Sequence, residues 1–244
     1  MMKRKYLVLI SLLAVIAISF AITSSTLFGR EPEHMTVVAF GDSNTAGSNW
    51  TLEKFPSESK WFSQLSAKIP QHTLINKGIG GHTTEHARLR FKRDVLTYNP
   101  DIVLIMFGTN DSRLINGRHQ VSEERFLENL EYFILSLKKI NAQPVLMTTI
   151  PIVDKLYHQR HPELSPSVSP KAANEEYNEI TRQLAIKHKI QLVDLNKAFI
   201  RVAGGSSDKA LQAAGLLDSS GTHMSPEGAK AAAKEVYEVM RKME

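Results

Sequence analysis

The sequence has no cysteine among its 244 residues. This absence excludes a disulfide-stapled scaffold, a zinc site with thiolate ligands, an iron–sulfur cluster and a cysteine nucleophile. Internal repeats, low-complexity tracts and Pro/Gly/Ser-rich linkers are absent as well. With 42% hydrophobic residues, the chain is too apolar to be disordered and is long enough for one sizeable core. We therefore expect one folded domain. The lack of cysteine does not show in which cellular compartment this domain lies.

The net charge beyond the N-terminus is close to zero. The formal net charge is +5, of which the acid-free residues 1–30 contribute +4 through Lys3, Arg4, Lys5 and Arg30. The rest of the chain is nearly neutral and has no basic stripe with interleaved aromatic residues. We therefore expect no nucleic-acid partner.

An apolar run from Tyr6 to Ile22 follows the basic start of the chain and is interrupted only by Ser11 and Ser19. It is longer than most signal-peptide cores and just reaches the lower limit for a membrane-spanning helix. Residues 1–30 are therefore predicted to be a signal peptide or a single-pass membrane anchor, and residues 31–244 the folded domain. Basic residues on the short N-terminal side predict that this domain is extracytoplasmic, either secreted or attached to the membrane.

From Met35 onward, short apolar runs alternate with segments of helical periodicity. The predicted strands are Met35–Phe40, Thr73–Ile75, Ile102–Phe107, Pro144–Thr149 and Ile190–Leu195. The predicted helices are Lys60–Ile69, Thr84–Leu96, Ser122–Ile140, Pro170–His188 and Ser225–Lys242. This alternation implies an α/β fold whose parallel sheet is covered on both faces. Ligands of such sheets bind beyond the carboxyl ends of the strands, so the residues that follow each strand are the candidate site.

Polar residues and glycines follow the first three predicted strands. The segments are Gly41-Asp42-Ser43-Asn44, Asn76-Lys77-Gly78-Ile79-Gly80-Gly81 and Gly108-Thr109-Asn110-Asp111, and His223 stands just before the last helix. Together they offer the parts of a serine hydrolase, with Ser43 as nucleophile and His223 as the base that takes its proton. The backbone N–H groups of Ser43 and Gly81 and the side-chain amide of Asn110 can form an oxyanion hole.

The sequence resembles the SGNH hydrolases, also called the GDSL esterase and lipase family, over about residues 35–240. The matching blocks are Gly41-Asp42-Ser43, Asn76-x-Gly78-x-x-Gly81, Gly108-x-Asn110-Asp111 and Gly221-Thr222-His223. The resemblance implies a three-layer α/β/α fold of flavodoxin type, with a central parallel sheet of about five strands. It also implies hydrolysis of carboxylic esters, acetyl or acyl, through an acyl-enzyme and without a metal or other cofactor. The substrate would be a small-molecule, glycan or lipid ester.

The acid of the catalytic triad departs from the family pattern. The family usually has an acid three residues before the histidine, and that position is Ser220 here, with Asp218 two residues earlier. The acid accepts the Nδ1 proton of the histidine and stabilises the imidazolium. We predict Asp218 in this role, with the Ser220 hydroxyl or a main-chain carbonyl as alternatives. Ser220 also favours a second hypothesis, a cell-surface domain that binds a glycan or acyl ligand with little or no turnover.

The segment His82-Thr83-Thr84-Glu85-His86 fits the H-x-x-E-H pattern of a zinc peptidase. We expect no metal there, because His82 adjoins Gly81 at a predicted helix start and a zinc site would leave Ser43 and His223 without roles.

Other polar and aromatic residues have structural interpretations. Asp42 and Asp111 are expected to hold their loops by accepting hydrogen bonds from backbone N–H groups. Asn174 and Asn178 lie one helical turn apart and are either buried partners or exposed. The aromatic residues are expected to pack in the core and loops rather than to form an acyl-binding wall; they are Trp50, Phe55, Trp61 and Phe62.

Overall fold

A parallel sheet of five strands forms the centre of the domain. The computed structural model describes residues 34–47 and 55–243, and in this part of the chain the sheet has the order β2-β1-β3-β6-β7. Its strands are β1 (Thr36–Gly41), β2 (Thr73–Gly78), β3 (Ile102–Met106), β6 (Gln143–Met147) and β7 (Gln191–Val193). All neighbouring pairs are parallel. This is the 2-1-3-4-5 order of flavodoxin-like sheets, so the predicted sheet is confirmed.

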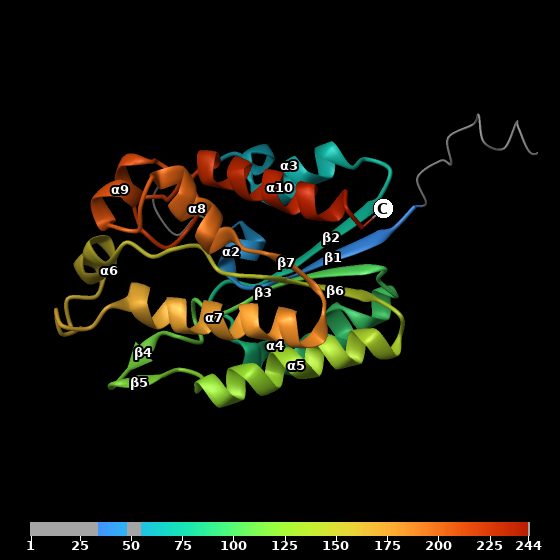
Figure 1. Ribbon diagram of the computed structural model, residues 1–244, viewed down its shortest axis with the longest axis horizontal. Helices are drawn as coiled ribbons and strands as arrows, with labels where there is room; N and C mark the ends of the chain where they lie inside the picture. The colour runs from blue at the N-terminus through green and yellow to red at the C-terminus, as the bar shows by residue number, and fades with distance from the viewer. Residues whose placement is uncertain (1–33, 48–54, 244) are drawn as a thin grey trace, which may run out of the picture. The chain divides into compact units, whose positions relative to one another are not determined.

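Helices cover both faces of the sheet and complete three layers (Figure 1). One face carries α3 (Trp61–Lys68), α8 (Leu195–Ala203) and α10 (Pro226–Met240), and the other carries α4 (Thr84–Asp94), α5 (Glu123–Lys139) and α7 (Pro170–His188). Along β1, Val37 and Ala39 pack into the first core and Val38 and Phe40 into the second. Because successive side chains point to opposite faces and both faces are buried, the central strands are continuously apolar.

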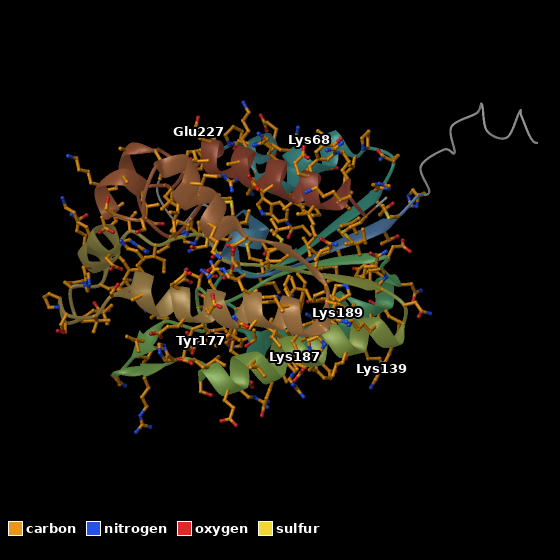
Figure 2. All side chains as sticks on the ribbon, in the orientation of Figure 1. Lys68, Lys139, Tyr177, Lys187, Lys189 and Glu227 are labelled. Atoms are coloured by element: carbon orange, nitrogen blue, oxygen red, sulfur yellow. The ribbon has the colours of Figure 1, made fainter. Side chains whose placement is uncertain are left out.

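Two predicted helices, Ser122–Ile140 and Ser225–Lys242, begin at the predicted place, and a serine caps each of them. The Ser122 side chain accepts a hydrogen bond from Arg125 N at the start of α5, and the Ser225 side chain accepts one from Gly228 N at the start of α10. At the other ends, exposed basic residues such as Lys139 of α5 and Lys187 of α7 lie at the surface of their helical layer (Figure 2). There they interact favourably with the carbonyl ends of the helices.

Three strands, β2, β6 and β7, end more than one residue away from their predicted ends, and β1 and β3 end within one residue of theirs. β2 continues through the polar Asn76 to Gly78. It is an edge strand whose residues are all at least partly exposed, so it can include polar residues. β6 ends before Thr149, whose N–H donates to Asn178 Oδ1 at 2.8 Å. β7 ends at Val193 because the Asp194 side chain accepts a hydrogen bond from Lys197 N and starts α8, which the sequence did not predict.

Several short elements were also missed. They are α2 (Ser43–Ala46), the antiparallel pair β4 (Leu114–Ile115) and β5 (Arg118–His119), α6 (Asp154–Arg160) and α9 (Asp208–Ala213). Each is too short for a hydrophobic periodicity to be recognised.

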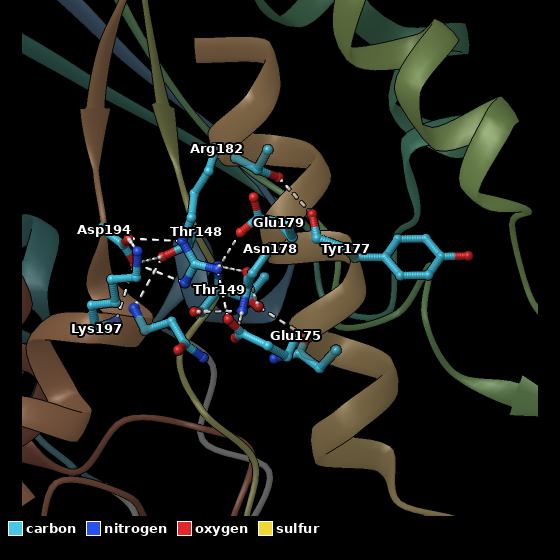
Figure 3. Close-up of polar contacts among 12 residues, drawn as sticks. Thr148, Thr149, Glu175, Tyr177, Asn178, Glu179, Arg182, Asp194 and Lys197 are labelled. Atoms are coloured by element: carbon cyan, nitrogen blue, oxygen red, sulfur yellow. Dashed lines mark hydrogen bonds and ion pairs between the residues drawn. The ribbon is translucent and has the colours of Figure 1, made fainter. Parts of the chain in front are cut away.

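Arg182 is a buried cation that ties α7 to the ends of β6 and β7 (Figure 3). Its Nε donates to Asp194 Oδ2 at 2.8 Å and its Nη1 to Glu175 Oε1 at 2.6 Å, and its side chain is only 6% exposed. Thr148 at the end of β6 donates to Asp194 Oδ1 at 3.1 Å. Burial acts to raise the pKa of Asp194, but the hydrogen bonds from Arg182 hold that pKa below its usual value. The ion pair therefore forms in the native state and fixes this corner of the fold.

We predict that Arg182→Ala lowers the free energy of unfolding by about 3 kcal/mol, because the half-buried Asp194 carboxylate loses its guanidinium partner and keeps the more distant, exposed Lys197 at 3.8 Å. Urea-induced unfolding measures the change. Arg201→Ala is the matched control, since Arg201 pairs with Glu235 at the surface and such pairs contribute at most about 1 kcal/mol. Equal losses in the two variants would contradict the structural role of Arg182.

Candidate active site

Ser43 lies at the carboxyl end of β1, where the chain turns directly into α2. The Asp42 side chain caps this turn by accepting a hydrogen bond from Asn44 N at 2.9 Å. The end of β2 approaches from the side, and a Cβ at Gly78 would lie 2.2 Å from Ala46 N. Only glycine allows this close approach of backbones. These contacts hold the turn in place, with the Ser43 hydroxyl at the carboxyl ends of the strands.

His223 reaches Ser43 from the loop that precedes α10. Its Nε2 lies 3.0 Å from Ser43 Oγ, and both side chains are buried. The two loops are also joined by Asn44, whose Nδ2 donates to Thr222 O at 3.1 Å. Burial, together with the nearby Arg160 cation, lowers the pKa of His223 to about 4. The ring is therefore neutral at neutral pH and can accept a proton.

Asp218 lies beside His223, but the Ser220 hydroxyl stands between the carboxylate and the ring. The Nδ1 atom of His223 is 2.9 Å from Ser220 Oγ and 4.0 Å from Asp218 Oδ2. Asp218 Oδ1 accepts hydrogen bonds from both the hydroxyl and the backbone N–H of Ser220. The direct carboxylate contact of an ordinary triad is thus replaced here by a contact through a serine side chain.

The candidate oxyanion donors lie in the same cleft, which has a volume of about 230 Å³ and includes Ser43, Gly81, Asn110 and His223 in its lining. Gly81 has φ +76°, and a Cβ built there would meet no atom within 4 Å, so its backbone is open to the cleft. This left-handed conformation favours glycine. The Asn110 amide Nδ2 donates to Asp42 Oδ2 at 3.2 Å and to His82 O at 3.1 Å. An oxyanion in the cleft would share the amide hydrogens of Asn110 with these two acceptors, or would replace one of them.

Asp42 and Asp111 are both buried and hold loops, as the sequence analysis predicted. Asp42 caps α2, and Asp111 Oδ1 accepts hydrogen bonds from the backbone N–H and the hydroxyl of Thr84 at 2.8 and 2.5 Å. Burial raises the pKa of Asp42 to about 7 and that of Asp111 to about 6. Asp42 also positions Asn110, a link that no local sequence pattern reveals.

The side chains of the H-x-x-E-H segment are engaged at the start of α4. His82 Nδ1 accepts a hydrogen bond from Arg90 Nε at 3.2 Å, and His86 Nδ1 forms a capping box with Thr83. Glu85 contacts Arg125 and Asn129. These contacts give the segment a role in starting the helix.

Of the four aromatic residues considered above, Trp61 is buried in the core, and its Nε1 donates to Asn44 O at 2.9 Å. Phe62 packs on the same core, and Phe55 lines a narrow pocket beside Ser43. Trp50 lies outside the described residues. The packing role is thus confirmed for Trp61 and Phe62.

Asn174 and Asn178 are both buried, and the Oδ1 atoms of both lie 2.9 Å from the Thr149 hydroxyl and share its one proton. Asn174 Nδ2 also donates to Ile150 O at 3.0 Å, and Asn178 Oδ1 accepts from Thr149 N at 2.8 Å. They hold the loop that follows β6, so the buried alternative is the correct one.

Arg160 on α6 is a site residue that the sequence analysis missed. Its Nε donates to Ser220 O at 3.1 Å and its Nη2 to Thr222 Oγ1 at 3.2 Å. It also lines the cleft. No signal could have found it, because Arg160 lies far from His223 in the sequence and belongs to a short unpredicted helix.

A model of the GDSL-like lipase/acylhydrolase family matches residues 39–231. The chain belongs to this family. Its strand-end blocks and the contact between Ser43 and His223 lie within the matched residues. The SGNH/GDSL resemblance inferred from the sequence is thereby confirmed.

Several relatives of this family member carry esterase names, and one is named a lipoprotein. It is 43% identical over 205 residues to the uncharacterized lipoprotein YqeF of Bacillus subtilis strain 168, covering 80% of this chain and 84% of that protein. It is 29% identical over 141 residues to an arylesterase of Vibrio mimicus, and the match covers 56% of this chain and 64% of the arylesterase. The crystal structure of the acetyl xylan esterase AlAXEase superposes with a TM-score of 0.67 at 26% identity, covering 84% of this chain and 98% of that one. The protein is a carboxylic ester hydrolase of the GDSL family.

Proposed function

We propose that the protein is a serine esterase that cleaves acetyl or acyl esters through an acyl-enzyme on Ser43. The observation that carries the proposal is the 3.0 Å contact between Ser43 Oγ and Nε2 of a neutral, buried His223 at the cleft. A serine hydroxyl is a weak nucleophile by itself and needs an adjacent base of this kind.

In this mechanism Ser43 Oγ attacks the ester carbonyl carbon while its proton passes to His223 Nε2. The tetrahedral intermediate then expels the alcohol, which takes the proton from Nε2 and leaves the acyl group on Ser43. Water attacks the acyl carbon with His223 again as base, which releases the acid and restores the serine.

Negative charge on the carbonyl oxygen would be stabilised by the N–H groups of Ser43 and Gly81 and by the Asn110 amide. Among the hydrogen bonds of residues 34–47 and 55–243, none uses the N–H of Ser43 or Gly81 as donor. Donors that are fixed in place before the reaction cost little reorganisation when the charge develops.

The substrates proposed are small-molecule, glycan or lipid esters. Relatives are named arylesterase, acetylxylan esterase and thioesterase/lysophospholipase, so ester chemistry is shared while the alcohol and acyl parts differ. A series of p-nitrophenyl esters with acyl chains of increasing length would identify the acyl group that the cleft accepts.

Ser43→Ala should abolish hydrolysis of the best ester in that series, because the attacking atom is removed while the turn remains. Wild-type protein should also be labelled by a fluorophosphonate probe and release a burst of alcohol. Ser66→Ala, at an exposed position on α3, is the matched control and should retain activity. Residual turnover above a few per cent of wild type would refute the nucleophile, and specific ligand binding with no turnover in the wild type would support the binding-domain alternative.

Asn110→Ala should lower kcat by about 10²–10³-fold with little change in KM, because its amide meets the oxyanion better than the ground-state carbonyl. Steady-state kinetics at saturating ester separates the two constants. Circular dichroism checks that the Asp42 and His82 loops remain folded. A change confined to KM would mean that Asn110 only binds substrate.

We also propose that the domain is exported and that residues 1–30 direct it, as a signal peptide or as a membrane anchor. The basic start and the apolar run support this orientation. The relative YqeF is named a lipoprotein, but this chain has no cysteine that could carry a thiol-linked lipid. Within residues 34–47 and 55–243, no helix combines the length and the hydrophobicity of a membrane span.

Expression of the full chain in a bacterial host should give a domain that protease digests when added to cells stripped of their wall. A chain lacking residues 1–30 should be protected inside the same cells. Membrane fractionation and mass spectrometry then distinguish an anchor from a cleaved signal. A full chain that is uncleaved, soluble and protease-protected would contradict export.

A further inference from the structure

The loop from Leu217 to Met224 is closed like a hairpin and places an acid and a base opposite each other. Leu217 and Met224 form an isolated antiparallel bridge, and Asp218 N donates to His223 O at 2.9 Å. Gly221, with φ +69°, makes the turn, and its N–H donates to Asp218 O at 3.0 Å. This closure brings the Asp218 side chain to the Nδ1 side of the imidazole.

Ser220 occupies the space between these two side chains. Its hydroxyl lies 2.9 Å from His223 Nδ1 and is hydrogen-bonded to Asp218 Oδ1. Thr222 N also donates a hydrogen bond to Ser220 Oγ, at 3.2 Å. A hydroxyl has one proton to give and two lone pairs to accept with, so Ser220 can bond to Asp218, to Thr222 N–H and to His223 Nδ1 together. Thr222 Oγ1 also lies close, 3.0 Å from Ser220 Oγ and 3.2 Å from His223 Nδ1, and it accepts a hydrogen bond from Arg160 Nη2.

We propose that Ser220 is a positioning residue that relays the interaction between Asp218 and His223, so that the esterase works with the series Asp218, Ser220, His223 and Ser43. The inference rests on the proposed function of Ser43 and His223 and deepens it.

The direction of each hydrogen bond follows from what each group can donate. Ionised Asp218 can only accept, so the Ser220 hydroxyl proton points to Oδ1. The Ser220 oxygen then accepts from His223 Nδ1–H, which leaves the Nε2 lone pair facing Ser43. Ser220 therefore selects the tautomer that catalysis requires, as the acid does in an ordinary triad. During attack one proton moves, from Ser43 Oγ to Nε2, and Ser220 keeps its own.

The carboxylate still stabilises the imidazolium, although it acts over a longer distance. Asp218 Oδ2 is 4.0 Å from Nδ1, and the site is buried, where charges interact more strongly than in water. The polarised Ser220 hydroxyl passes part of this effect to the ring. Arg160 donates to Ser220 O and to Thr222 Oγ1, so it holds the loop that carries the relay.

The test is a double-mutant cycle on kcat with Ser220→Ala, Asp218→Asn and the combined variant. Ser220→Ala should lower kcat by about 10²–10⁴-fold, the upper figure being the loss when a serine protease triad has its acid replaced by an amide. KM should change little, because neither side chain touches substrate in the proposed mechanism. Because Asp218 acts largely through Ser220, the loss of kcat in the double variant should be far smaller than the product of the two single losses.

Ser220→Asp tests the relay in the opposite direction by placing a carboxylate next to Nδ1. In that background Asp218→Asn should cost less than three-fold in kcat, whereas in wild type it should cost at least ten-fold. Circular dichroism and urea unfolding confirm that each variant is folded. Ser219→Ala, an exposed neighbour on the same loop, is the matched control and should keep wild-type kcat.

The relay is overturned if folded Ser220→Ala retains kcat within about three-fold of wild type, or if the losses from Ser220→Ala and Asp218→Asn multiply. Ser43→Ala in the same assay separates this failure from that of the proposed function. If Ser43→Ala stays active, the serine mechanism itself is wrong, whereas an inactive Ser43→Ala beside a fully active Ser220→Ala removes only the relay.

Discussion

The hydrogen bond between Ser43 and His223 joins two points that are 180 residues apart in the chain. Every layer of the fold contributes to this contact. The sheet places the end of β1 between β2 and β3, so that the loops carrying Gly81 and Asn110 reach the same edge. The start of α10, capped by Ser225, brings in the loop that holds His223. Without a correctly ordered sheet, Ser43 and His223, the proposed nucleophile and base, would not meet.

Beneath the site, buried side chains form hydrogen bonds that join the ends of neighbouring strands. Arg90 is the main example, because its guanidinium donates to Gly41 O at 2.9 Å and to Lys77 O at 2.8 Å. It thereby ties together the carboxyl ends of β1 and β2, and it lies over the Phe40 ring at 4.4 Å. Such fully bonded networks are rigid, since any displacement would leave a buried polar group without a partner. Rigidity at this edge keeps the cleft organised for catalysis.

The loop that carries His223 shows how a triad can tolerate a displaced acid. A catalytic histidine needs a hydrogen-bond acceptor at Nδ1 and a negative charge nearby, and these two need not come from one side chain. In the proposed relay, Ser220 supplies the acceptor and Asp218 the charge. Arg160 of α6 donates a hydrogen bond to Ser220 O and so holds the loop in place. The departure from the family pattern is therefore compatible with an active enzyme, and the structure offers a physical reason for the serine in the acid position.

The sequence by itself determined the parallel sheet, the two helical layers and the identities of Ser43, Gly81, Asn110 and His223 as candidates. These depend on neighbours in the chain, through apolar runs, capping residues such as Ser122, and the rule that sites lie beyond strand ends. Only the tertiary structure decided that Ser220 separates Asp218 from His223, that Asp42 positions Asn110, and that Arg160 supports the catalytic loop. Those contacts join residues from different strands and helices, and their distances depend on strand register and on how the loops pack, which no local pattern encodes.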